Sequence, residues 1–325
     1  MDTLNEFISI TKIIENIYNF RLKEFIDNNQ NLCELSINFF NEDELPDYTK
    51  EHVQESYLLK YSLAYSFEFY EMYNQVIDSL KDKQYINVLS LGCGSCIDYW
   101  SLCYTLYKKN LNIKINYIGV DKIKWESNGI EELFDKTNCA TNYKFNKREE
   151  DNSYFLKSEI KDLENAINNN SKCNEINSVL SNLDIIIFPR SMNEICSNEE
   201  NNEVIKNISK KITNNQFYLL SSIIYIKADK FLFNKVIGII SSSLNFKNIL
   251  NGNILPSNKE CGISAIDSNF QYPEYVKNAY KTICQYRDKD DNICHIYNKE
   301  CFINQGPILY ADKIKYMYGT IGKEL

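Results

Sequence analysis

The stretch VLSLGCGSCIDYW, residues 88–100, constrains the fold more than any other part of the chain. An apolar strand runs directly into Gly92 and Gly94, and a helix is expected from residue 97. Glycine permits a positive φ and removes the Cβ that would hold a ligand off the backbone. The start of a helix also offers unpaired N–H groups. Strand, glycine turn and helix in this order predict a ligand site at the carboxyl end of a parallel strand.

Strands and helices alternate around this turn. Strands are expected at 85–91, 112–120, 183–189 and 216–226, with a weak strand near 142–145; helices are expected at 97–109, 153–168, 197–212 and 229–243. Such alternation predicts a mostly parallel sheet with helices on both faces. From about residue 281 the segments KTICQYR, ICHIY and DKIKYMYGTI break the rhythm, so we expect the sheet to end in antiparallel pairing.

Two regions are expected. Residues 1–82 form a predicted helical region, and residues 83–325 form the α/β domain with a cysteine-rich insertion around 255–305. A long helix from about 52 to 80 carries an aromatic stripe with a four-residue repeat, made of Tyr57, Tyr61, Tyr65, Phe69 and Tyr73. We interpret the stripe as packing on the core; the alternative is a lid over the ligand pocket, lined by Tyr61 or Tyr65.

The amino-acid composition disfavours proteins that bind nucleic acid, span a membrane or depend on disulfides. With 36 basic against 44 acidic residues, the net charge is -8, which disfavours a protein that neutralises nucleic-acid phosphates. The sequence has neither a run of about 18 apolar residues nor the layout of a signal peptide, so we expect no membrane span. Eleven cysteines without compact spacing are typical of reduced thiols, and we expect a cytoplasmic protein.

The second strand ends in YIGVD and places Asp121 at its carboxyl end, 27 residues past Gly94. A carboxylate there can accept both hydroxyls of a ribose; the alternatives are a strand-end carboxylate or a helix N-cap. Turns that bind dinucleotides have a further glycine or alanine three residues past the second glycine. Ile97 stands there, which disfavours a pyrophosphate and a nicotinamide oxidoreductase.

VLSLGCGSC followed by YIGVD resembles the first two motifs of class I S-adenosylmethionine-dependent methyltransferases. The resemblance implies a Rossmann-like, seven-stranded, mostly parallel sheet with antiparallel C-terminal strands, and S-adenosyl-L-methionine as the cofactor. It also implies that the glycine turn lines the methionine portion and that the aspartate holds the ribose. The expected cofactor-binding residues are Gly92, Cys93, Gly94, Asp98, Asp121, Lys122 and Pro189.

The sequence departs from the family pattern at two places. Ser90 stands where the family commonly has an acidic residue, and Cys96 replaces the third glycine. Cysteine is tolerated there if its φ is negative. Asp98, at the helix start, is expected to take over contact with the amino group of the cofactor, unless it only caps the helix.

The adenine end of the cofactor has several candidates. Trp125 can cover the adenine face, or pack its helix on the sheet as a partly buried side chain. Three acidic residues after the third strand, Glu149, Glu150 and Asp151, are candidates for the adenine amino group.

The loop after the fourth strand, DIIIFPRSMNEI, faces the transferable methyl group in the family. It lacks the Asn/Asp/Ser-Pro-Pro-aromatic sequence of DNA amino-methyltransferases, so that activity is disfavoured. We expect catalytic roles for Arg190, Ser191 and Glu194. The guanidinium of Arg190 can pair with a carboxylate or phosphate of the substrate, or with Glu194 in a structural salt bridge.

Four cysteines of the tail, Cys261, Cys284, Cys294 and Cys301, are numerous enough to hold zinc. None of them is spaced C-x₂-C, so free buried thiols are the preferred interpretation and no metal site is predicted.

The sequence therefore predicts an S-adenosylmethionine-dependent methyltransferase that acts on a small molecule or a protein. The alternatives are an RNA methyltransferase, and a non-catalytic interaction protein with this fold, because Ser90 and Cys96 depart from the pattern. Neither the methyl acceptor nor the oligomeric state follows from the sequence.

Overall fold

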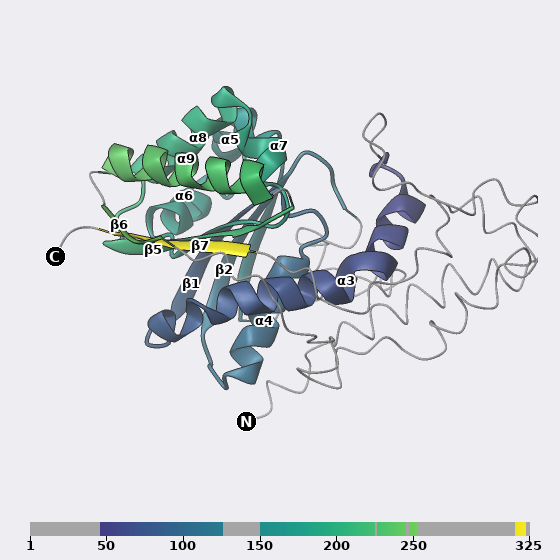
Figure 1. Ribbon diagram of the computed structural model, residues 1–325, viewed down its shortest axis with the longest axis horizontal. Coiled ribbons are helices and arrows are strands. Elements are labelled where there is room, and N and C mark those ends of the chain that lie inside the picture. Colours follow the sequence, from purple (N-terminus) through teal and green to yellow (C-terminus); the bar gives the residue numbers. More distant parts are fainter. Residues whose placement is uncertain (1–45, 126–149, 225, 245–246, 252–315, 323–325) are drawn as a thin grey trace, which may run out of the picture.

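The computed structural model describes residues 46–125, 150–224, 226–244, 247–251 and 316–322 (Figure 1). Seven strands of this part form one sheet in the order β3-β2-β1-β4-β5-β7-β6. The strands are β1 (Tyr85–Leu91), β2 (Lys114–Asp121), β3 (Asn152–Lys157), β4 (Ile185–Phe188), β5 (Gln216–Ser222), β6 (Lys247–Asn251) and β7 (Tyr316–Gly322). The first five run parallel, and β7 pairs antiparallel with both β5 and β6. The predicted parallel sheet with an antiparallel end is confirmed.

Helices cover both faces of the sheet. Their bounds are α3 (Glu51–Asn74), α4 (Ile97–Lys108), α5 (Leu163–Asn168), α6 (Cys173–Ser181), α7 (Met192–Cys196), α8 (Glu199–Lys210) and α9 (Ile226–Leu244), with short 3₁₀ turns η3 (Ile77–Leu80) and η5 (Ile160–Asp162). Figure 1 shows α3 and α4 on one side of the sheet and α5 to α9 on the other. None of the helices described is long and apolar enough to cross a membrane.

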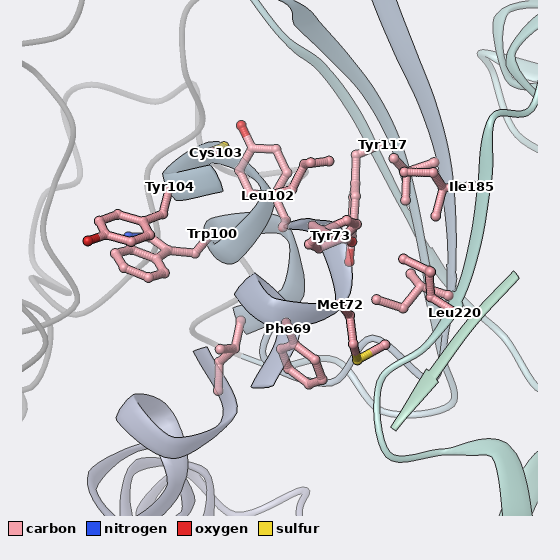
Figure 2. Packing of buried hydrophobic residues seen from close by; sticks show 14 of the residues in the cluster. Phe69, Met72, Tyr73, Trp100, Leu102, Cys103, Tyr104, Tyr117, Ile185 and Leu220 are labelled. Atoms are coloured by element: carbon pink, nitrogen blue, oxygen red, sulfur yellow. The ribbon is translucent and has the colours of Figure 1, made fainter. Parts of the chain in front are cut away.

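Alternation along the central strands builds two cores. Val88 of β1 points to the layer of α3 and α4, whereas its neighbour Leu89 joins the core under α5 to α9. Successive residues of a strand face opposite sides of the sheet, and both side chains are buried because helices cover both sides. Figure 2 shows the first core, where Met72 and Tyr73 of α3 lie near Tyr117 of β2.

The third strand corrects the sequence interpretation. Residues 153–157, predicted to begin a helix, belong to β3, and helical turns start only at Ile160. As an edge strand, β3 buries only three of its residues and carries a weak apolar signal. Glu150 and Asp151 therefore precede the strand. Asp151 accepts hydrogen bonds from Tyr99 and from the backbone of β2, at the edge away from the glycine turn.

Other boundaries shift by a few residues. The predicted helix 197–212 is α8, and the short helix α7 that precedes it was not predicted. The N-terminal helix ends at Asn74 before η3, and β5 ends at Ser222. The weak strand at 142–145, Glu149, the segments KTICQYR and ICHIY, residues 1–45 and the insertion around 255–305 lie outside the described residues. The division at residue 82 stays a prediction.

Candidate functional site

The order of strands reverses next to β1, which pairs with β2 on one side and β4 on the other. In open α/β sheets, ligands bind at the carboxyl ends of the strands at such a point. The glycine turn follows β1, Asp121 ends β2, and Arg190 follows β4. The residues that the sequence marks for chemistry therefore gather at one edge of the sheet.

Gly92 is required by packing within the protein. The backbone N–H groups of Gly92 and Cys93 both donate to the carbonyl oxygen of Val120, at 2.8 and 3.1 Å, which ties the turn to β2. Gly92 has φ +73°, and a Cβ on it would lie 2.4 Å from the Cβ of Ser191. The Ser191 hydroxyl donates to the carbonyl oxygen of Leu91. Ser191 thus fastens the loop after β4 to the end of β1.

Gly94 and Asp121 are joined directly. Gly94 has φ +50°, and its N–H donates to Oδ2 of Asp121 at 2.8 Å, while the N–H of Ile123 donates to Oδ1 at 2.9 Å. Burial raises the pKa of the Asp121 carboxyl, and these two hydrogen bonds and the charge of exposed Lys122 oppose the rise. Each carboxylate oxygen accepts one backbone N–H and keeps a second lone pair for a hydroxyl group.

Cys96, at the position of the third glycine, does not meet the condition of a negative φ under which cysteine was expected to be tolerated. Cys96 has φ +59° and ψ 30°, a left-handed conformation, and it precedes α4. The turn therefore keeps a backbone shape that glycine adopts readily. Cys93 is also buried, and Gly119 makes room for it, since a Cβ there would lie 3.0 Å from Sγ of Cys93. Burial raises the pKa of both thiols.

Asp98 lies beneath the turn with no exposed surface. The hydroxyl of Tyr117 donates to its two carboxylate oxygens, at 3.1 and 2.9 Å. Burial raises the pKa of Asp98 to about 6, and the nearby hydroxyl of Ser90 opposes that rise without reaching hydrogen-bond geometry. A carboxylate from the helix thus lies beside the strand position where the family has its acid. This placement favours support of the turn; contact with a cofactor stays a prediction.

Trp125 covers the glycine turn. A Cβ on Gly94 would lie 3.6 Å from its indole ring, which is 5% exposed. The indole stacks on Tyr48, with ring centroids 5.3 Å apart, and meets the edge of Tyr57 at 5.1 Å. Trp125 is therefore a buried side chain that packs between the turn and Tyr57 of α3, and covering of the adenine face stays a prediction.

The aromatic stripe of α3 runs from Trp125 toward Arg190. Tyr57 contacts Tyr61, and Tyr61 stacks on Tyr65, with centroids 4.9 and 4.8 Å apart. Burial keeps the pKa of Tyr57 well above its usual range and raises that of Tyr65 to about 12, so these phenols stay neutral. The stripe is part of a core, as predicted, and it also faces the carboxyl edge of the sheet.

Arg190 pairs with a residue that the sequence did not indicate. Its Nη1 donates to Oε2 of Glu68 on α3 at 3.0 Å, and its guanidinium lies 4.2 Å above the ring of Tyr65. The structural alternative, a salt bridge with Glu194, does not form, because Glu194 is exposed and accepts no hydrogen bond from Arg190. Arg190 has φ +64° and follows half-buried Pro189 at the end of β4.

The structure therefore brings the turn, Asp121, Trp125 and Arg190 to one edge, with α3 above them. It adds Glu68 and Tyr48, for which no local spacing gave a signal. Within the described ranges there is no group of three or more residues that could hold a metal ion, and the four tail cysteines lie outside them.

The order and directions of the strands are those of the class I methyltransferase fold that the motifs implied. No family model matches the sequence, and no curated protein matches it either.

Solved structures resemble the chain at low identity. A cyclopropane-fatty-acyl-phospholipid synthase-like protein from Lactobacillus casei is 9% identical, with 92% of this chain and 99% of that chain covered and a TM-score of 0.38. The plantazolicin methyltransferase BpumL, with a desmethylPZN analogue and SAH, is 12% identical, with 96% and 99% covered and a TM-score of 0.38. A putative class I methyltransferase from Listeria monocytogenes is 12% identical, with 97% and 80% covered and the same TM-score.

Proposed function

We propose that the chain is an S-adenosylmethionine-dependent methyltransferase. The observation that carries the proposal is the turn from Gly92 to Cys96, which is hydrogen-bonded to Asp121 where the strand order reverses. Its backbone would hold the methionine portion of the cofactor, Asp121 the ribose, and Trp125 the adenine. Lys122 and Pro189 flank these groups. When bound, S-adenosylmethionine supplies a methyl group on a sulfonium, which a nucleophile takes.

The residues present fit such a cofactor. Both oxygens of Asp121 have lone pairs left, and Gly94 has no Cβ to hold a ligand off the backbone. The indole of Trp125 lies on Gly94 and would have to turn away from it to stack on adenine. Asp121 is the carboxylate at this edge, and the charges of Lys122 and Glu194 act on it in opposite directions.

The loop after β4 would serve the reacting end. Ser191 positions this loop through Leu91, Arg190 holds α3 through Glu68, and Glu194 faces solvent beside the cofactor site. An acidic chain supports a small molecule or a protein as acceptor more than RNA. A cytoplasmic location is part of the same proposal.

A non-catalytic interaction protein is the second candidate. The packing of Trp125 on Gly94, with Tyr48 behind it, favours it, because a ligand over the turn has to move these rings.

Calorimetric titration separates the two candidates. We expect S-adenosylmethionine and S-adenosylhomocysteine to bind with micromolar affinity, and the control NADH not to bind. Asp121→Ala should weaken binding by about 1.5–3 kcal/mol, the contribution of a hydrogen bond to a charged group. Asp82→Ala, at an exposed position, is the control and should bind as wild type. If neither methyl-donor ligand binds, the interaction protein is the better proposal; if Asp121→Ala binds normally, the ribose role is wrong.

A further inference from the structure

Glu68 is a buried carboxylate with one oxygen unused. The residue is 2% exposed, and its Oε2 accepts the hydrogen bond from Arg190. Its Oε1 has no hydrogen-bond partner among the described residues. Ser222 is close enough to lower the pKa of Glu68, yet its hydroxyl is directed to Sδ of Met72, at 3.8 Å. A buried acceptor without a donor is costly, so a ligand that brings an N–H donor would gain by binding it.

The surroundings of this carboxylate already bind a cation. The guanidinium of Arg190 lies over the ring of Tyr65, 4.2 Å from its centroid. The faces of aromatic rings attract cations, and this phenol remains neutral. Arg190 neutralises Glu68, and at Asp121 the positive charge of Lys122 opposes that of Glu194. The preference for an N–H donor therefore rests on the unpaired Oε1 of Glu68 and not on the net charge of the edge.

The conformation of Arg190 supports a functional role for this pair. A non-glycine residue at φ +64° persists only where its surroundings impose it, and such residues cluster at ligand sites. The side chain of Arg190 is 22% exposed against 3% for Glu68, so the guanidinium forms the outer side of the pair. A ligand from solvent would reach Arg190 first and Glu68 behind it.

We propose that the methyl acceptor is a basic nitrogen compound, an amine or a guanidine, and that Oε1 of Glu68 accepts one of its N–H groups beside Tyr65. This inference rests on the proposed function and names its substrate class. The bound cation first gives one N–H proton to Oε1 of Glu68, which frees a lone pair on its nitrogen. That lone pair forms the new C–N bond with the methyl carbon, and the electron pair of the broken C–S bond stays on sulfur.

Binding to the full-length protein tests the proposal without any turnover. Benzylamine and benzylguanidine are the probes, phenylacetate and benzyl alcohol their anionic and neutral counterparts, each titrated in the presence of S-adenosylhomocysteine. We expect the two cations to bind at least tenfold more tightly than the counterparts. Glu68→Gln should remove that preference, whereas Glu71→Gln, three residues on along α3, should retain it. The wild-type preference stands as a result even if Glu68→Gln fails to fold.

Two results would overturn the proposal. The first is equal binding of all four probes by wild-type protein. The second is a preference for phenylacetate that Arg190→Gln abolishes, which would assign an anionic acceptor to this pair. Affinity for S-adenosylhomocysteine alone is measured in the same series. If that ligand binds and the probes do not discriminate, only the acceptor class is wrong; if it does not bind, the proposed function itself fails.

Discussion

Asp98 offers a test in which stability and ligand binding give separate answers. Its carboxyl is completely buried, and burial raises its pKa from 3.8 to about 6 despite the hydrogen bonds from Tyr117. The folded protein therefore prefers the protonated acid. The resulting stability is fully present below pH 3.8 and is lost as the pH rises through 6. Asp98→Asn replaces the acid by a neutral side chain of the same shape, which should remove this loss.

The size of the expected change in the free energy of unfolding follows from the pKa shift of Asp98. About two pKa units correspond to about 3 kcal/mol, since each unit is worth 1.36 kcal/mol. We expect Asp98→Asn to unfold with a free energy up to about 3 kcal/mol larger than wild type at pH 8, about half of that at pH 5, and less than 1 kcal/mol at pH 4. Urea unfolding of both proteins at each pH measures the difference, and other carboxyls cancel in it.

The reasoning is refuted if Asp98→Asn is the less stable protein at pH 8 and the difference is the same at pH 5. The charged hydrogen bond from Tyr117 would then outweigh desolvation. Ligand binding gives the second answer. If Asp98 only supports the turn, the variant should bind S-adenosylhomocysteine within about twofold of wild type; a loss of about 1.5–3 kcal/mol would assign it to the amino group.

Two further predictions concern the turn. In urea titrations, Gly92→Ala should lower the free energy of unfolding by more than about 2 kcal/mol, because the new Cβ would meet Ser191 at a residue with a positive φ. The control Gly238→Ala, at an open position in α9, should raise the free energy of unfolding by about 0.5–1 kcal/mol. Tryptophan fluorescence should change when S-adenosylhomocysteine binds, and Trp125→Phe should abolish the change while Trp100→Phe, buried against Tyr104, retains it. A signal that follows Trp100 instead would place the ligand away from the turn.

The sequence patterns predicted those features that depend on residues near one another in the chain. The run from Tyr85 to Leu91 is β1 with the bounds that its apolar residues indicated. The spacing from Gly94 to Asp121 is that of one strand–helix–strand unit, and the two residues are hydrogen-bonded. Neighbouring parallel strands end at the same edge, so this contact follows from connectivity alone.

Contacts between distant segments could not be predicted in the same way. The spacing of four residues offered Glu194 as an alternative partner of Arg190, but the partner is Glu68, 122 residues away in the sequence. The register of α3 against β4 determines that pair, and no periodicity within either element encodes it. Burial of β3 at the sheet edge is likewise a tertiary property, which the helical pattern after it obscured.

The backbone conformations connect the turn with the loop after β4. Three non-glycine residues of the described part have a positive φ: Cys96, Asn110 and Arg190. Asn110 follows the end of α4, where asparagine commonly adopts this conformation. The other two lie where the strand order reverses, and neither residue type adopts a left-handed backbone without cost. Cys96 is held by the bond from its N–H to the carbonyl oxygen of Cys93 and by burial, and Arg190 by Glu68 and Tyr65. Since packing maintains the positive φ at both positions, the backbone at this edge keeps a left-handed conformation although cysteine stands where the resemblance implies a glycine.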